Sequence, residues 1–136
     1  VLNIVRTATV ISQKGTSLFR KFSLTEAQFN VLFALKYKEK PWTQSDLGRR
    51  LVVTRASITS VLDKLEEKEL VKRNEVVGNR RIYHVDLTES GHALLEEVEP
   101  LYRKDIHFAL RKFDDKMCRN LINSLESIRQ EAEQLD

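Results

Sequence analysis

Apolar side chains recur at helical spacing along most of this chain, and one stretch alternates instead. The first seam alternates steps of four and three residues through Ile4, Ala8, Ile11, Gly15, Leu18 and Phe22. This heptad-like pattern predicts a helix over residues 3–22 that packs along another helix. The partner helix belongs either to the same chain or to a second copy.

The next helix is predicted by its start signal. Thr25 and Gln28 have the spacing of a capping box, in which each side chain bonds to the backbone N–H of the other residue. The helix that follows is expected to bury Phe29 and to end before Pro41, because proline disfavours helix in the residue before it. Trp42 is then expected in a short bridge segment.

Two short helices with a tight turn between them follow. Thr43 starts the first, with Asp46 as its capping partner, and Thr54 caps the second. Val52 and Val53 form the predicted turn. The second helix places four apolar residues on one face: Ile58, Val61, Leu62 and Leu65. This order of elements predicts a helix-turn-helix.

The alternating stretch lies between residues 71 and 87. Residues 71–76 and 82–87 are rich in β-branched side chains, and Gly78-Asn79 suits a turn with positive φ. A β-hairpin is therefore predicted. Thr88-Glu89 then starts a long helix, and a break at Asp114-Asp115 leads to a last helix. The apolar residues of these two helices are Leu94, Val98, Leu101, Phe108, Phe113, Met117, Leu121, Leu125, Ile128 and Leu135.

The second helix of the pair has a polar front and an acidic back. Its residues 54–60 are small or polar, apart from Arg55 and the inward-facing Ile58, whereas Asp63, Glu66 and Glu67 would be repelled by phosphates. The N-terminal half is therefore expected to enter the major groove of duplex DNA, where an arginine fork suits guanine edges or phosphates. The residues predicted to contact DNA are Thr43, Gln44, Ser45, Thr54, Arg55, Ala56, Ser57, Thr59, Ser60, Lys64, Arg73, Arg80 and Arg81.

The hairpin is the second predicted grip on DNA. Arg80 and Arg81 lie near its tip, and arginine is favoured in a narrow minor groove by the negative potential there. Alternatively, one of these arginines pairs with Asp63 or Glu75 and only orders the loop. Arg73 lies at the base of the hairpin, on a solvated strand face or in contact with a phosphate.

Charge and composition add little to this picture. The 136 residues carry a net charge of +3, and the acidic excess lies in residues 89–136, so the C-terminal third is not predicted as a nucleic-acid surface. Cys118 is the only cysteine, so no disulfide can form within the chain, as is usual in the cytoplasm. No signal peptide, transmembrane helix, metal-ligand spacing or catalytic set is recognised. No enzyme activity and no cofactor are predicted.

Three motifs together resemble a known family. They are Leu24-Thr25-x-x-Gln28, Asp63-Lys64-Leu65-Glu66, and Arg80-Arg81 followed by the run from Leu87 to Gly91. In this combination the chain resembles the MarR family of winged helix-turn-helix transcriptional regulators. The resemblance implies a mostly α fold with a small β-hairpin wing. It also implies a homodimer on a palindromic operator, in which the wing enters the minor groove, and usually repression that a small aromatic or phenolic ligand relieves.

The implied organisation has three parts. Residues 1–23 form an N-terminal dimerisation helix, residues 24–90 the winged helix-turn-helix domain, and residues 91–136 the C-terminal dimerisation helices. The residues predicted at the dimer interface are Ile4, Ala8, Ile11, Leu18, Leu121, Leu125 and Ile128. An alternative function is a winged-helix module that binds protein and not DNA.

Two features bear on how this chain compares with the family it resembles. Asn79 stands where family members usually carry an aspartate that pairs with the second wing arginine, so Arg81 is expected to be held less rigidly. Five aromatic residues gather in the first part of the chain: Phe19, Phe22, Phe29, Phe33 and Trp42. They form the core or, in part, line a pocket for the ligand.

Overall fold

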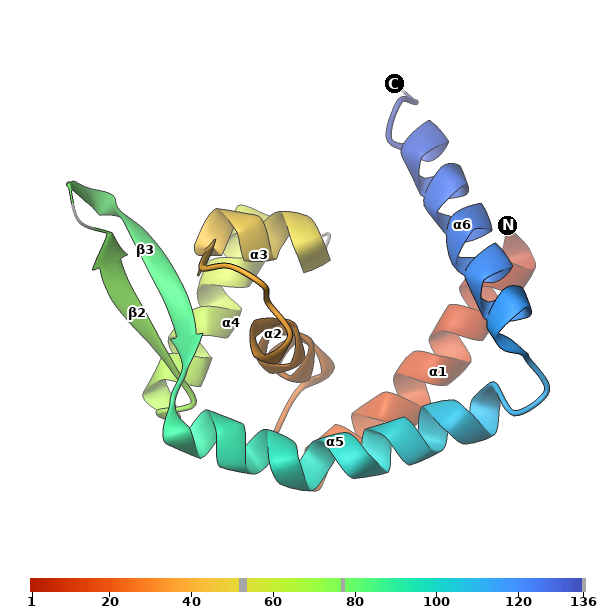
Figure 1. Cartoon of the computed structure of the whole chain (residues 1–136), viewed down its shortest axis with the longest axis horizontal. Helices are drawn as coiled ribbons and strands as arrows, with labels where there is room; N and C mark the ends of the chain where they lie inside the picture. Colours follow the sequence, from red (N-terminus) through yellow and green to blue (C-terminus); the bar gives the residue numbers. More distant parts are fainter. Residues whose placement is uncertain (52–53, 77, 136) are drawn as a thin grey trace. The chain divides into compact units, whose positions relative to one another are not determined.

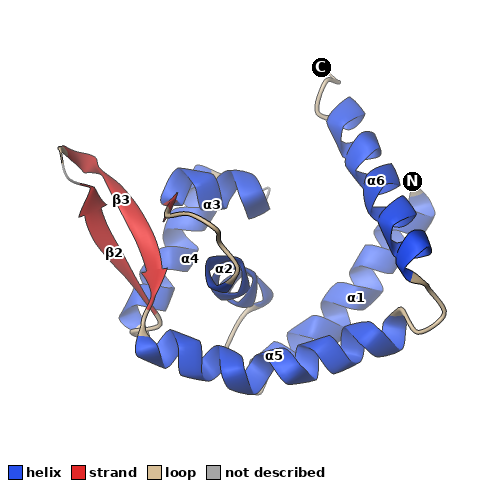
Figure 2. Ribbon diagram, in the orientation of Figure 1, coloured by secondary structure: helices blue, strands red, loops and turns tan. Residues whose placement is uncertain are grey.

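The computed structural model describes residues 1–51, 54–76 and 78–135, and it does not describe the side chains of Arg55, Arg80 and Arg81. The chain divides into two compact units, Val1–Tyr102 and Arg103–Asp136. The predicted turn at Val52 and Val53 lies outside the described residues. Figure 2 shows that helices predominate and that the strands are confined to the first unit, which confirms the predicted fold class.

The first unit begins with two helices, α1 (Leu2–Arg20) and α2 (Glu26–Lys36). The capping box of α2 is present, because the Thr25 side chain accepts a hydrogen bond from the backbone N–H of Gln28 at 3.2 Å and the Gln28 side chain accepts one from Thr25 at 3.1 Å. The sequence signal for this helix start is therefore confirmed.

The helix-turn-helix and the wing follow in the predicted order (Figure 1). The elements are β1 (Trp42–Thr43), α3 (Gln44–Leu51), α4 (Arg55–Glu67), β2 (Val71–Val76) and β3 (Asn79–Leu87). Trp42, expected in a bridge, instead forms a strand that pairs with β3. The wing is therefore part of a three-stranded antiparallel sheet in the order β1-β3-β2.

Aromatic rings occupy the centre of the first unit. The Phe19 and Phe29 rings stack with their centroids 4.1 Å apart, and Tyr102 lies 4.8 Å from Phe29. Phe29 is 1% exposed and Phe19 is 2% exposed. These rings join α1, α2 and α5 (Glu89–Ala109), so the prediction that the aromatic residues form the core is confirmed for Phe19 and Phe29.

Leu18 lies in this same core, and this corrects its predicted place at the dimer interface. Its side chain is 8% exposed because the last turns of α1 pack against α2 within the protomer. The earlier seam residues of α1, Ile4, Ala8 and Ile11, are exposed. The C-terminal end of the heptad-like seam therefore belongs to the core, and the dimer contacts of its earlier residues stay a prediction.

Helix α5 starts at the predicted place and carries a buried acid. The N–H of Gly91 donates to the Thr88 hydroxyl at 3.0 Å, while Leu95 and Val98 are fully buried.

Glu99 is also buried, and it accepts hydrogen bonds from Lys36 at 2.7 Å and from the Tyr37 hydroxyl. The carboxylate of Glu99 raises the pKa of Lys36.

The second unit contains the end of α5 and helix α6 (Asp115–Ala132). Asp114 caps α6 by accepting a hydrogen bond from the N–H of Met117 at 2.7 Å, at the predicted break. No described residue of α6 is buried. Its apolar residues, Leu121, Leu125 and Ile128 among them, are exposed.

Candidate nucleic-acid interface

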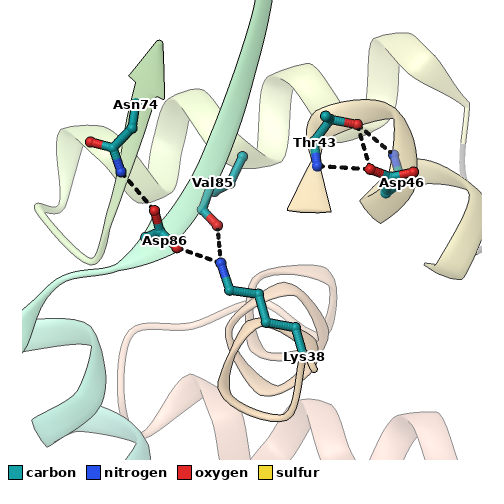
Figure 3. Close-up of polar contacts among 6 residues, drawn as sticks. All are labelled: Lys38, Thr43, Asp46, Asn74, Val85 and Asp86. Carbon is teal, nitrogen blue, oxygen red and sulfur yellow. Dashed lines mark hydrogen bonds and ion pairs between the residues drawn. The ribbon is translucent and has the colours of Figure 1, made fainter. Parts of the chain in front are cut away.

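Each helix of the helix-turn-helix begins with a capping interaction. The Thr43 hydroxyl accepts a hydrogen bond from the N–H of Asp46 at 3.2 Å, and the Asp46 carboxylate accepts one from the N–H of Thr43 at 2.9 Å (Figure 3). Arg49 also donates to this carboxylate at 2.6 Å. The hydrogen bonds from the backbone and hydroxyl of Thr43, with that of Arg49, lower the pKa of Asp46 to about 2.

The stabilisation from Asp46 is expected to depend on pH. Because its pKa is lower in the folded protein than its ordinary value of 3.8, the stabilisation is complete above about pH 4 and disappears as the pH falls towards 2. We expect Asp46→Asn to reduce the free energy of unfolding by about 1 kcal/mol at pH 6, a value discounted for solvent screening of a partly exposed carboxylate. Urea unfolding at pH 6 and pH 3 measures the difference, which should narrow at the lower pH. Glu97→Gln on an exposed face is the control, and a difference that does not change with pH would contradict the assignment.

Helix α4 is anchored by its apolar face and presents a small polar front. Ile58, Leu62 and Leu65 are at most 1% exposed. Thr54 caps the helix by accepting a hydrogen bond from the N–H of Ser57 at 3.2 Å. Of the residues predicted to contact DNA here, Thr54, Ala56, Ser57 and Ser60 are exposed. The predicted orientation of the helix, with its apolar face inward, is confirmed.

Gln44 and Thr59 are brought together by the fold. The side-chain amide of Gln44, at the start of α3, donates a hydrogen bond to the Thr59 hydroxyl of α4. Both residues were predicted to contact DNA separately. The structure places them as a link between the two helices of the pair.

The wing is a regular hairpin except near its tip. Strands β2 and β3 pair from Val71 opposite Leu87 to Glu75 opposite Tyr83, and the register shifts between Glu75 and Val76. Gly78 has φ of +86°, as predicted for the turn. Arg80 and Arg81 lie on β3 beside the tip, and their DNA contacts stay predictions, as does the interaction of Asn79 with Arg81.

Arg73, predicted to contact a phosphate or to lie on a solvated strand face, pairs with two acidic side chains. Its guanidinium group donates to Asp63 at 2.6 Å and to Glu66 at 2.5 Å, both on α4. The Arg73 side chain is only 19% exposed. Asp63 was one of the two predicted alternative partners for Arg80 or Arg81, near the tip of the hairpin. In the structure Asp63 pairs with Arg73, at the base of the hairpin.

Lys64 also lies away from the front of α4. It lines a groove of about 630 Å³ with residues of α1, of α2 and of the segment between them. The groove is lined by Thr16, Arg20, Ser23, Leu24, Thr25, Glu26, Gln28, Lys64, Glu67 and Lys68. None of the five aromatic residues considered for a ligand pocket is among them.

A lysine with no predicted role holds the other strand of the wing. Lys38 donates to the backbone oxygen of Val85 at 2.7 Å and to the carboxylate of Asp86, which also accepts from Asn74 at 2.6 Å (Figure 3). The Lys38 ammonium group and the Asn74 amide lower the pKa of Asp86. No motif marks Lys38, since it follows α2 and meets β3 only through the tertiary fold.

Comparison with known proteins decides the family. A model of the MarR family matches residues 24–83. The HTH-type transcriptional regulator MhqR of Bacillus subtilis (strain 168) is 32% identical over 106 residues, which cover 75% of this chain and 72% of MhqR. The chain belongs to the MarR family. It is thus a DNA-binding regulator of transcription, and not an enzyme.

Other relatives and a solved structure extend the comparison. The transcriptional repressor NicR of Pseudomonas putida is 35% identical over 96 residues, which cover 68% of this chain and 60% of NicR. The chain spans 57% of the length of PecS from Dickeya dadantii. The crystal structure of an S. aureus MepR–DNA complex has a TM-score of 0.84 at 20% identity and covers 96% of each chain, which shows the same fold.

The described residues offer no helix that is both long and apolar enough to span a membrane. Within those residues, no group of three or more histidine, cysteine or acidic side chains is arranged to hold a metal ion.

Proposed function

We propose that this MarR-family protein acts in the cytoplasm as a homodimeric repressor that binds a palindromic operator. The observation that carries the proposal is the capped and exposed front of α4, formed by the small residues Thr54, Ala56, Ser57 and Ser60. A helix N-terminus favours phosphate through its free N–H groups and its dipole. The front of α4 therefore enters the major groove, with Arg55 as the contact to bases or phosphates.

The wing contributes the second contact. Arg80 and Arg81 lie on β3 next to the turn at Gly78, where an extended hairpin can reach an adjacent minor groove. Each protomer then contacts one half-site, and the two half-sites lie about one helical turn, or 34 Å, apart. Alternating major-groove and minor-groove contacts give the sequence preference of the dimer.

Exposed apolar side chains at both ends of the chain support the homodimer. Ile4 and Ile11 of α1 are 42% and 49% exposed, and Leu125 of α6 is 37% exposed. Rows of such residues on amphipathic helices are favourable to bury against a partner. Size-exclusion chromatography with light scattering measures the state directly, and a monomer at micromolar concentration would exclude the model with two half-sites.

Repression and release by a ligand rest on a relative and on a groove. The relative NicR is named a transcriptional repressor. The groove between α1, α2 and α4 has room for a small molecule and is lined by Arg20, Lys64 and Lys68 together with Glu26 and Glu67. We assign the predicted aromatic or phenolic ligand to this groove. A ligand there would contact both the end of α1 and the recognition helix α4.

The direct test is fluorescence anisotropy with duplex DNA from upstream of the gene for this protein. We expect Arg55→Ala and Arg81→Ala each to weaken binding by about 10- to 100-fold, as is usual for an arginine that contacts a base or phosphate. Arg119→Ala removes the same charge from α6 and should bind like the wild type. Unchanged affinity in both wing and recognition-helix variants would refute these contacts.

A winged-helix module that binds protein is the second candidate function. The salt dependence of binding separates the two candidates, because DNA binding releases counterions and weakens steeply as salt rises. A partner held by apolar contacts would respond far less. Binding to DNA that is independent of salt, or absent at low salt, would favour the protein-binding module.

A further inference from the structure

The three strands of the sheet meet in two adjacent rungs at the base of the wing. In the one nearer the base, termed the rung, Trp42 of β1 pairs with Val85 of β3, and Val85 pairs with Arg73 of β2. Val85 is fully buried. Beyond the two rungs, β2 and β3 continue towards the tip without β1, so the direction of the wing is set by how the rung is held.

Arg73 holds the β2 side of the rung to the recognition helix. Its two terminal nitrogens contact two carboxylates one helical turn apart, Asp63 and Glu66. A planar guanidinium that engages two acceptors restricts rotation as well as distance. This contact therefore limits the angle between β2 and α4.

Lys38 holds the β3 side of the same rung to the end of α2. Its ammonium group donates to the backbone oxygen of Val85 and to Asp86, and Asn74 of β2 donates to the other oxygen of Asp86 (Figure 3). The Lys38 side chain is 15% exposed, so solvent competes little for these contacts. The two lysine bonds and the arginine fork hold the rung from opposite strands.

The length of the wing makes this arrangement matter for binding. Arg80 and Arg81 lie four to five residues from Val85 along β3, or about 13–17 Å at 3.3 Å per residue. A tilt of about 10° at the rung would move these residues by roughly 2–3 Å, which exceeds the tolerance of a hydrogen bond.

We propose that Arg73 and Lys38 are positioning residues that aim the wing relative to the recognition helix, and that neither contacts DNA. The proposal rests on the proposed function, because it concerns the same interface with DNA. A positioning role and a phosphate contact make different demands on residue 73. A positioning role requires the forked guanidinium of arginine, whereas a positive charge alone is not sufficient for it.

The test is a double-mutant cycle on the full-length protein. The probe is a duplex enriched from a random-sequence pool by binding to the wild type. Arg73→Lys keeps the charge but loses the fork, and Arg73→Gln loses both. We expect both variants to weaken binding by about tenfold, and by less than about twofold in an Arg80→Ala/Arg81→Ala background. The reason is that the wing no longer contributes contacts in that background.

Two further variants complete the design. Lys38→Met should also weaken DNA binding less when the wing arginines are absent. This variant keeps the test available if a variant at Arg73 does not fold, as judged by thermal melting. Lys72→Gln removes an exposed charge from β2, and its effect on affinity should be the same in both backgrounds.

The possible outcomes distinguish a failure of the positioning role from a failure of the proposed function. Wild-type affinity for Arg73→Lys, or equal losses for Arg73→Gln with and without the wing arginines, would overturn the positioning role while the wild type still binds DNA. Failure of the wild-type protein to enrich any duplex would instead overturn the proposed function itself.

Discussion

Gly91→Ala is expected to lower the free energy of unfolding by about 3 kcal/mol, at the upper end for an overpacked core. A Cβ at this position would lie 2.1 Å from the backbone oxygen of Leu70 and 3.3 Å from the Leu87 side chain. Leu70 is itself fixed, because its oxygen accepts a hydrogen bond from Thr88 at 3.2 Å. The crossing of the segment after α4 over the first turn of α5 must therefore open.

Chemical denaturation with a matched variant measures this effect. Ser90→Ala places an alanine one residue earlier, on an exposed side of the helix where a Cβ is already present, and should change stability by less than about 0.5 kcal/mol. Alanine is a better helix former than glycine by about 1 kcal/mol. The steric cost at residue 91 must therefore exceed this gain before Gly91→Ala lowers stability. A Gly91→Ala protein as stable as the wild type would show that the crossing is not tight.

Phe29→Ala is expected to cost about 3–5 kcal/mol, the range for removing a large aromatic side chain from a core. Phe29 is 1% exposed and its ring lies between those of Phe19, Phe33 and Tyr102, with centroids at 4.1, 5.5 and 4.8 Å. Removal of the ring leaves a cavity where α1, α2 and α5 meet. Because these helices flank the DNA-binding elements, weaker DNA binding should accompany the loss of stability.

Two comparisons define the result for Phe29. Phe29→Leu keeps most of the volume, so it should cost less than half as much as Phe29→Ala in urea unfolding. Tyr37→Ala removes an aromatic side chain that is 50% exposed and should cost less than Phe29→Ala. Equal losses for Phe29→Ala and Phe29→Leu would mean that the ring contacts, and not the filled volume, determine stability.

Local signals predicted the elements well because the groups that produce them are close in sequence. The capping pair of Thr25 and Gln28 and the caps at Thr43 and Thr54 satisfy backbone N–H groups within one turn. The apolar spacing of Ile58, Leu62 and Leu65 requires only that one face of a helix be buried. Such signals do not depend on which distant segment covers that face.

The candidate interface was predicted only in part, because several of its side chains find partners far along the chain. Arg73 appeared free to bind phosphate, yet it meets Asp63 and Glu66 once β2 folds back along α4. Lys38 carried no signal, since its partners at Val85 and Asp86 are more than 45 residues away. Leu18 fitted a helical seam but packs into the core of its own protomer.

The sequence by itself determined the order of the helices and of the two wing strands, the polar front of the recognition helix, and the resemblance to the MarR family. Those properties depend on local spacing and on residue type. Only the tertiary structure decided which charges are paired, why no side chain fits at Gly91, and how the base of the wing is held. These depend on contacts between segments far apart in the sequence, so they exist only after the chain has folded.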